Sequence, residues 1–378
     1  ARVRDPRRAL AAVARSEGGV VELHPGTWLV TDPATTERLL ASRHAVTART
    51  ARGAAASWGE GGLERWMAAR RAVRPELTEA AAARFAPITA SSARHAVTRW
   101  ASAARVDAMA EATRLMSALN THYVLGEPAP SLTALVEDEL STARRAFRPA
   151  SLRLPRKQLA TRSALHAHLR AAAPGRGLVA ALTGAGLDER STAQAVRTML
   201  LSGHHVPAAA LAWALHELSA RPDLQRRIRD EATARPDPRA ADLPLCRAVV
   251  RETLRLHPPI WQLRRVLDAP VPGFPAGAEV LFSPYVNHRD PAAHPDPDRF
   301  DPHRWTTAPR PSPGSYLPFA LGPRFCPGSH LATAELAVVL AAVLERHHVA
   351  PYRAPKPSRG VLNAPRRLRL TLVPHDRR

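Results

Sequence analysis

The N-terminal pattern of apolar and polar residues predicts a β-hairpin followed by a short helix. Residues 20–23 and 28–30 are rich in Val, Leu and Trp, and the turn-forming pair Pro25-Gly26 lies between them. Asp32 then offers an N-cap and Pro33 a first-turn proline for a helix that runs through Leu40. The small residues at 53–62 favour a loop rather than a packed element.

Apolar residues recur at helical spacing from residue 63 to about 173, in Ala- and Arg-rich segments. Turn formers interrupt this stretch at residues 126–128 and again near Pro149 and Pro155. A longer helix is predicted from about residue 191 to 220. It is apolar on most faces, which indicates a central, buried position.

The C-terminal part of the chain alternates helices with short strands. The pattern predicts a helix that ends at residues 255–259, strands at 264–267 and 279–282, and a proline-rich meander at 290–318. A final helix at about 328–347 and a strand at 368–373 close the chain. Neither a repeat nor a change in composition divides it, so we expect one mainly α domain over residues 1–378 with a small β-sheet region.

Composition narrows the class of protein. The 378 residues are 45% hydrophobic, enough to fill a sizeable core. Cys246 and Cys326 are the only cysteines, and no signal peptide or long apolar run is evident. We therefore expect no disulfide framework, no membrane span and a reducing, cytoplasmic location.

The net charge of +21 rests on arginine, because Lys157 and Lys356 are the only lysines. Such a surface attracts acidic proteins or phosphates. The arginines are scattered rather than gathered into a patch interleaved with aromatic residues, which argues against nucleic acid. Two interpretations stay open: an acidic protein partner, or the codon bias of a GC-rich genome.

The segment at residues 318–328, PFALGPRFCPG, carries the strongest chemical signal. It places Cys326 between a glycine-bearing turn and the start of a helix, where backbone N–H groups stabilise a thiolate. Arg324, two residues earlier, suits a carboxylate of a cofactor bound by the same sulfur.

This segment resembles the haem-binding loop of cytochromes P450, Phe-x-x-Gly-x-Arg-x-Cys-x-Gly, with every defining position present from Phe319 to Gly328. The resemblance implies the mostly helical P450 fold, haem b as cofactor and Cys326 as the proximal iron ligand. It also implies a monooxygenase that activates dioxygen.

A second motif supports the first. Glu252 and Arg255 stand at i and i+3 on one helix face, and Arg299 follows in the meander. By the resemblance, these residues form a buried structural triad that braces the loop presenting Cys326.

The resemblance also implies cations for the two haem propionates. Arg324 is one candidate; Trp66 with Arg70 is another, although that spacing is also typical of an ordinary amphipathic helix. Arg264 and Arg265 are the third, and the sequence leaves open which of the two faces the haem.

The long central helix departs from the family pattern Ala/Gly-Gly-x-Asp/Glu-Thr. After Gly203 this chain has His205 in place of the acid and Val206 in place of the alcohol, so the usual proton relay is missing. Pro207 has no N–H for the Gly203 carbonyl, and we expect it to kink or open the helix there. An imidazole at His205 could carry protons; alternatively, His204 or His205 is simply hydrogen-bonded to a neighbouring helix.

Three functional interpretations of this departure remain open. The protein is a reductase-dependent monooxygenase with non-standard proton delivery, or a peroxide user, or a catalyst of coupling, dehydration or rearrangement. A rival of another class is a haem-binding recruitment protein without oxygenase turnover.

By resemblance, the substrate site is lined by the loop at 53–62, by Gly203 and Val206 and by Met199, Ile260, Trp261, Gln262 and Leu263. These residues suit a medium-sized lipophilic secondary metabolite such as a terpenoid, polyketide or aromatic derivative. An acidic ferredoxin with its reductase is the expected electron donor.

Overall fold

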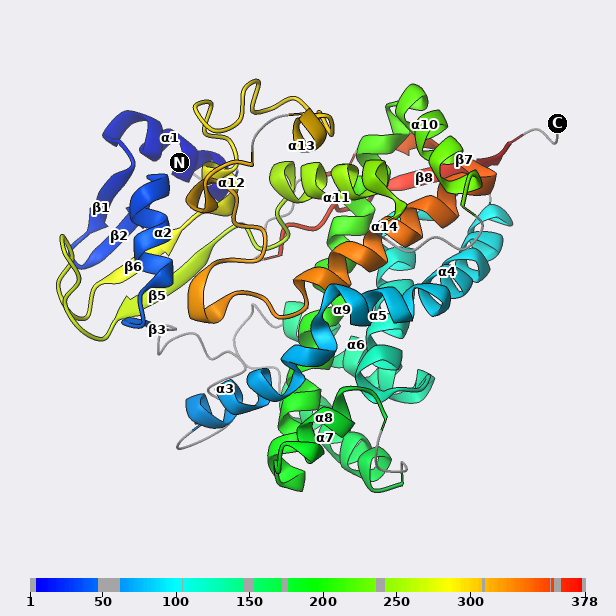
Figure 1. Cartoon of the computed structure of the whole chain (residues 1–378), viewed down its shortest axis with the longest axis horizontal. Helices are drawn as coiled ribbons and strands as arrows, with labels where there is room; N and C mark the ends of the chain where they lie inside the picture. Colours follow the sequence, from blue (N-terminus) through cyan, green and yellow to red (C-terminus); the bar gives the residue numbers. More distant parts are fainter. Residues whose placement is uncertain are drawn as a thin grey trace.

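The computed structural model describes residues 5–46, 62–103, 105–145, 153–171, 176–235, 242–307, 310–353, 355–356 and 362–375. Helices dominate it, and a small sheet lies at one end of the molecule (Figure 1). The expected mainly α architecture is confirmed. The predicted loop at 53–62 lies outside the described residues apart from Gly62, which begins a helix.

The N-terminal hairpin forms as predicted. Strands β1 (Val20–His24) and β2 (Thr27–Val30) pair antiparallel, and helix α2 (Pro33–Ala41) follows. The Asp32 side chain accepts a hydrogen bond from the Thr35 N–H and so caps α2. Helix α1 (Pro6–Glu17), capped by Asp5, precedes the hairpin and was not predicted.

The larger sheet has five strands in the order β1-β2-β6-β5-β3. Strand β6 (Glu279–Phe282) runs parallel to β2 and antiparallel to β5 (Leu263–Leu267), and β3 (Ala45–Val46) closes the edge. A second sheet joins β4 (Val106–Asp107), β8 (Arg369–Pro374) and β7 (His347–Arg353). The predicted strands at 264–267, 279–282 and 368–373 are confirmed within one residue at each end.

The helical part contains most of the core. Its first half consists of α3 (Gly62–Val73), α4 (Glu79–Ala101), α5 (Ala108–Leu125), α6 (Pro130–Arg145), α7 (Arg153–Ala171) and α8 (Gly177–Gly184). The second half adds α10 (Pro222–Thr233), α11 (Pro244–Leu256) and α14 (Ser329–Arg346), with short helices α12 (Pro284–Asn287) and α13 (Arg304–Thr307).

The central helix α9 (Glu189–Ser219) passes through the helical part and contacts α3, α5, α8, α11 and α14 (Figure 1). The Asp188 carboxylate caps its start by accepting from the Ser191 N–H. Most α9 side chains are buried, as its apolar pattern predicts. Within the described ranges, none of the helices is both long and apolar enough to cross a bilayer.

Candidate haem-thiolate site

Cys326 lies in a tight loop between the short helical turn at Gly322–Arg324 and the start of α14. Its N–H donates to the Phe319 carbonyl at 2.9 Å, which closes the loop. Gly322 has φ +68°, and a Cβ there would lie 2.2 Å from the Leu40 carbonyl oxygen. The loop therefore needs glycine at this position, because its backbone presses on the end of α2.

Cys326 is partly exposed as a residue and forms no disulfide. Burial raises its pKa, while a backbone hydrogen bond from Gly328 and the charge of Arg70 oppose that shift. Cys246 lies instead at the start of α11, where full burial and Glu231 raise its thiol pKa well above the usual value. Only Cys326 combines access with a donor and a nearby cation, so it is the cysteine suited to ligation.

Three guanidinium groups form a cluster that reaches Cys326 through Arg70: the charge of Arg324 acts on both Arg70 and Arg265, and the charge of Arg70 acts on Cys326. Burial lowers the pKa of all three, and the charge of Arg324 lowers the pKa of Arg70 and Arg265 further. For Arg265 the value falls to about 10. In the described part of the chain, no carboxylate forms an ion pair with any of them. Partly buried like charges without counter-ions indicate a site for a dianionic group, such as the two propionates of a haem.

The structure places Arg264 and Arg265 differently, and the placement of Arg265 favours it as the residue that faces the cofactor. Arg264 is half-exposed and donates to the Glu279 carboxylate at 2.8 Å, away from the cluster. Arg265 is 9% exposed and interacts with Arg324. This follows from alternation along β5, which sends neighbouring side chains to opposite faces.

Arg70 also holds the cysteine loop directly. Its guanidinium donates to the Phe325 carbonyl at 2.5 Å and lies 5.7 Å from the centre of the Trp66 ring, one turn earlier on α3. Their spacing of four residues therefore places the Arg70 guanidinium over the Trp66 ring. Of the two residues, Arg70 is the one shown to contact the cysteine loop, and a role of Trp66 in holding the cofactor stays a prediction.

The Glu252–Arg255 pair is completely buried on α11 and is bidentate, with contacts of 2.8 and 2.9 Å. Arg255 donates its remaining bonds to the carbonyls of His288, Pro297 and Arg299 in the meander. Because both partners are fully hydrogen-bonded, the cost of burying the charges is largely offset.

The expectation that the Arg299 side chain completes this cluster is wrong. Arg299 is exposed, and among the described residues only its carbonyl contacts this cluster. The Glu252 carboxylate instead accepts from Arg304 at 3.1 Å and from the Trp305 indole at 2.9 Å. The meander turns between the two arginines, and helix α13 aims the later one inward.

His288 connects this cluster to the cysteine loop and was not predicted. It is fully buried; Nδ1 lies 3.0 Å from the Arg255 carbonyl, and Nε2 accepts from the Leu317 N–H at 2.6 Å. These partners require a neutral ring with its proton on Nδ1, and burial lowers its pKa well below the usual value. Leu317 begins the loop of Cys326, so the two hydrogen bonds of His288 connect α11 to that loop.

Helix α9 is continuous from Glu189 to Ser219 with Pro207 inside it, so the helix does not open there; a kink at Pro207 stays a prediction. One missing N–H does not interrupt the helix, because the flanking hydrogen bonds persist and neighbouring helices pack around it. Met199, Ser202 and Val206 are partly or fully exposed and recur at helical spacing. We call these three residues the open face of α9.

The two histidines of α9 are both buried. His204 turns toward α5, where its Nδ1 lies 3.1 Å from the Asn120 amide nitrogen. Burial lowers the pKa of His204 to about 4, so it is neutral at physiological pH. The alternative that one histidine bonds to a neighbouring helix therefore holds for His204. Ser202, whose hydroxyl donates to the Thr198 carbonyl at 2.7 Å, was overlooked on the open face.

The residues expected to line the substrate site after α11 have mixed exposure. Trp261 is only 8% exposed, and its carbonyl accepts from the Ser283 hydroxyl, so it belongs to the packing of this segment. Ile260, Gln262 and Leu263 are partly exposed, and Ile260 bridges to Leu362.

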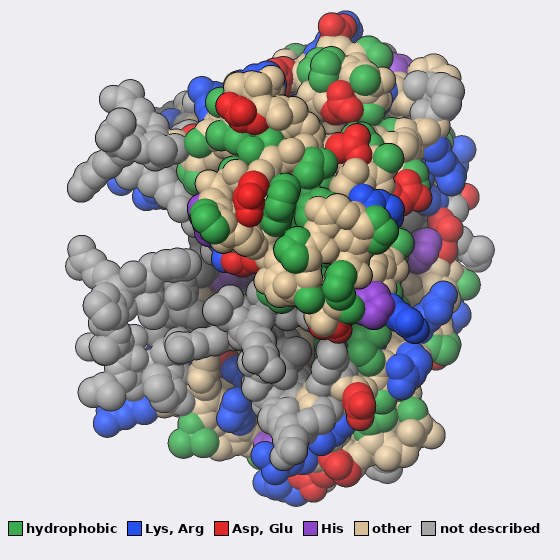
Figure 2. Space-filling model, turned by 90° about the vertical axis from the view of Figure 1, so that its left-hand side faces the viewer, with side chains coloured by type: hydrophobic (Ala, Val, Ile, Leu, Met, Phe, Trp, Pro, Cys, Tyr) green, Lys and Arg blue, Asp and Glu red, His purple; other side chains and the backbone are tan. Residues whose placement is uncertain are grey.

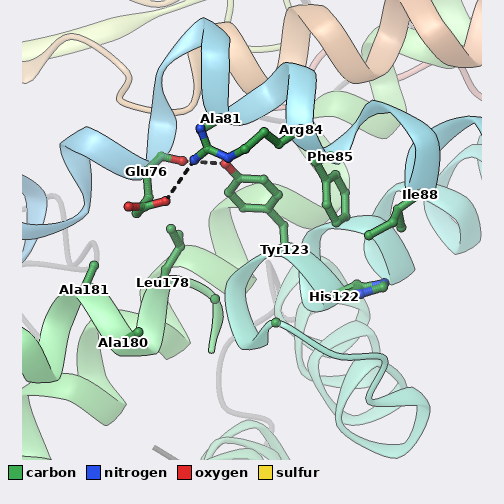
Figure 3. Close-up of a pocket in the computed structure, with 12 residues that line it drawn as sticks. Glu76, Ala81, Arg84, Phe85, Ile88, His122, Tyr123, Leu178, Ala180 and Ala181 are labelled. Atoms are coloured by element: carbon green, nitrogen blue, oxygen red, sulfur yellow. Dashed lines mark hydrogen bonds and ion pairs between the residues drawn. The ribbon is translucent and has the colours of Figure 1, made fainter. Parts of the chain in front are cut away.

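A separate groove of about 580 Å³ lies between α4, α5 and α8 (Figure 3). Phe85 and Tyr123 form its aromatic wall at 4.8 Å between ring centres, and a Glu76–Arg84 ion pair spans its rim. It contains neither the cysteine loop nor the arginine cluster. No cluster of three or more His, Cys, Asp or Glu side chains suited to a bare metal ion occurs in the described ranges.

The family model for cytochrome P450 matches residues 154–372. Two similar curated proteins are cyclooctat-9-en-7-ol 5-monooxygenase of Streptomyces melanosporofaciens and human mitochondrial 25-hydroxyvitamin D-1 alpha hydroxylase. Each is 36% identical, and the matches cover 45% and 43% of this chain and 39% and 35% of those proteins. The chain thus spans about two fifths of the length of the curated relatives it matches.

Solved structures resemble the chain over nearly all of its length. A six-coordinated cytochrome P450 from Thermus thermophilus superposes with a TM-score of 0.80 at 25% identity, covering 98% of both chains. A zebra fish cytochrome P450 gives 0.80 at 22% identity and shows the same fold. The family match over more than half the chain, together with the cysteine loop and its arginine cluster, shows that the chain belongs to the cytochrome P450 family, whose cofactor is haem b bound through a cysteine thiolate.

Proposed function

We propose that the protein is a haem-thiolate monooxygenase that oxidises a medium-sized lipophilic small molecule of secondary metabolism. The observation that carries the proposal is the cluster of Arg70, Arg265 and Arg324, which reaches Cys326 through Arg70 and has no carboxylate partners in the described structure. When bound there, haem supplies the chemistry of dioxygen activation. Cys326 would ligate the iron, and the three arginines would hold the propionates.

The α9 residues that would deliver protons differ from the family pattern. Neither His205 nor Val206 can repeat the acid–alcohol pair, and His204 is neutral and turned toward Asn120. That leaves three groups on or near α9: the His205 imidazole, the Ser202 hydroxyl and the Gly203 carbonyl, to which Pro207 offers no N–H. We propose that ordered water held by these groups delivers the protons.

The substrate class rests on the open face of α9 and on relatives. Met199 and Val206 are apolar, and Ile260 and Leu263 are partly exposed beyond α11. A relative's name specifies an unsaturated alcohol, cyclooctat-9-en-7-ol, as its substrate. A lipophilic skeleton with one or two polar groups fits both observations, and terpenoids, polyketides and aromatic derivatives share that chemistry.

An acidic ferredoxin is the proposed electron donor. Phe325, adjacent to the ligand cysteine, is 41% exposed, and Arg247, Arg251 and Arg310 approach one another on the surface near α11. Basic and acidic side chains are interspersed on the face in Figure 2, which is therefore not uniformly basic. We propose that the docking surface includes Phe325 as its aromatic anchor and that basic side chains around it attract the acidic partner. The two cysteines without a disulfide fit a cytoplasmic setting.

A peroxide-using enzyme is the second candidate, because the altered segment from His205 to Pro207 lacks the usual relay. A screen for ligands that displace iron-bound water, followed by product analysis with ferredoxin, reductase and NADPH or with hydrogen peroxide, separates the two. Turnover with peroxide alone selects the second. If both systems leave every binding ligand unchanged and an acidic carrier protein co-purifies, the recruitment alternative holds.

The cofactor itself is tested first. The purified protein should bind haem, and its reduced carbon-monoxide adduct should show the red-shifted Soret band of thiolate ligation. Cys326→Ala should abolish that band, whereas Cys246→Ala should keep it. A wild-type protein without haem would overturn the proposal.

A further inference from the structure

Helix α5 packs along α9, and one polar side chain of α5 reaches the backbone of the site helix. The Asn120 amide nitrogen lies 3.1 Å from the Leu200 carbonyl and 3.5 Å from the Met199 carbonyl. The same nitrogen lies 3.1 Å from Nδ1 of His204. One amide thus contacts two consecutive carbonyls of α9 and the histidine side chain one turn after Leu200.

Gly203 makes this contact possible. A Cβ built on it would lie 2.1 Å from Oδ1 and 2.4 Å from Cγ of Asn120. Glycine inside a helix costs about 1 kcal/mol relative to alanine. Its φ lies outside the left-handed region, so this glycine is required by the approach of Asn120 and not by its own conformation.

The contact lies just before the weakest point of the α9 hydrogen-bond ladder. Pro207 cannot donate to the Gly203 carbonyl, so the turn of α9 that follows Gly203 lacks one internal hydrogen bond. The carbonyls of Met199 and Leu200 already accept from the helix, and the amide adds a donor from outside it. Asn120 therefore holds the part of α9 that directly precedes the turn with the missing hydrogen bond.

The open face lies beside this contact on the same stretch of helix. Met199 belongs to both, because its carbonyl faces Asn120 and its side chain is partly exposed. Ser202 and Gly203 are consecutive, so a shift of the Gly203 backbone moves the Ser202 hydroxyl with it. A displacement of α5 would therefore move the side chains of the open face.

We propose that Asn120 is a positioning residue that fixes the turn from Met199 to His204 through its close contact with Gly203, and so sets the distance between the open face of α9 and ligands of the haem iron. The inference rests on the proposed function, because it assigns the open face to the distal side of the haem.

Three variants of the holoprotein test it without knowledge of the substrate. Asn120→Ala removes the contact, Asn120→Asp keeps the volume but cannot donate to the carbonyls, and Gly203→Ala displaces the amide. The control is Thr113→Ala on the same helix, whose hydroxyl donates only to the Met109 carbonyl of α5. The readouts are the dissociation constant of imidazole for the ferric iron, the rate of carbon-monoxide rebinding and the thermal midpoint.

We expect each of the three variants to shift the imidazole constant or the rebinding rate by about 3-fold to 10-fold, and Thr113→Ala to leave both unchanged. Asn120→Ala combined with Gly203→Ala should perturb them less than the sum of the single changes, because removal of the amide makes room for the methyl group.

Two results would overturn the proposal: folded, haem-loaded Asn120 variants with wild-type ligand kinetics, or strict additivity of Asn120→Ala and Gly203→Ala. Equal shifts in Thr113→Ala would count against it as well, since they would reflect general loosening of α5. Failure of the proposed function is distinguishable, because the wild type itself would then lack the thiolate spectrum.

Discussion

The Arg70 guanidinium on α3 donates a 2.5 Å hydrogen bond to the carbonyl of Phe325, the residue directly before Cys326. A single side chain thus links helix α3 to the loop of the ligand cysteine while its charge faces Arg324 and the thiol. Cofactor retention and loop geometry depend on the same residue.

Arg70→Ala should weaken haem retention because it removes both a propionate partner and the bond to the loop. A charge-assisted hydrogen bond contributes about 1.5–3 kcal/mol, so haem transfer to apomyoglobin should be at least about 10-fold faster. The control is Arg71→Ala, which changes an exposed neighbour. Equal transfer rates in both variants would contradict the assignment.

The finding that Arg304, and not Arg299, contacts Glu252 predicts different outcomes for two variants. Arg304→Ala should lower the free energy of unfolding by about 1–3 kcal/mol, because Glu252 loses a hydrogen-bonded cation. Arg299→Ala should leave stability nearly unchanged, since its side chain is exposed. Urea unfolding of the two variants measures the difference, and the reverse order would restore the original expectation.

Glu335 on α14 predicts a pH dependence of stability. It is buried, its Oε1 has no partner in the described structure, and burial raises its pKa to about 8. The native state therefore holds this proton more tightly than the unfolded state. Its contribution is fully present below the unfolded pKa, near 4.5, and is lost as the pH rises through about 8.

Glu335→Gln should remove that component, so the variant should lose less thermal stability than the wild type between pH 6 and about 9. Glu345→Gln, which lies later on α14 and is paired with Arg94, serves as the comparison. Parallel melting curves for wild type and Glu335→Gln across this range would show that the carboxyl is not protonated in the native state.

His205→Ala tests proton delivery. If the imidazole relays protons, product formed per NADPH consumed should fall by about 10-fold or more, the range of a lost general acid, while turnover with peroxide is spared. His204→Ala should leave that ratio nearly unchanged, because His204 faces α5 and is neutral. A wild-type rate and coupling in His205→Ala would remove His205 from the mechanism.

The elements that local patterns specify were predictable. The hairpin at β1 and β2, the buried helix α9 and the loop of Cys326 each depend on residues close together in the chain. Helix α1 was overlooked although Asp5 and Pro6 form an ordinary N-cap signal.

The contacts that complete the site could not be predicted from local sequence. Asn120 and Leu200 are 80 positions apart, and His288 and Leu317 are 29 apart. The choice of Arg304 over Arg299 likewise depends on how a proline-rich meander turns, and no periodicity encodes that path. Pairings across such distances are set by tertiary packing, which a single sequence does not display.

The His288 bridge between α11 and the cysteine loop sets an acid limit for the holoprotein. Its Nε2 must accept from Leu317, so a second proton on the ring would replace an attraction with a repulsion. The unfolded state takes up that proton near pH 6.5, whereas the native state resists it, so acidification favours loosening of the loop. Purification and storage near neutral pH should therefore preserve cofactor occupancy, and acidification should favour release of haem.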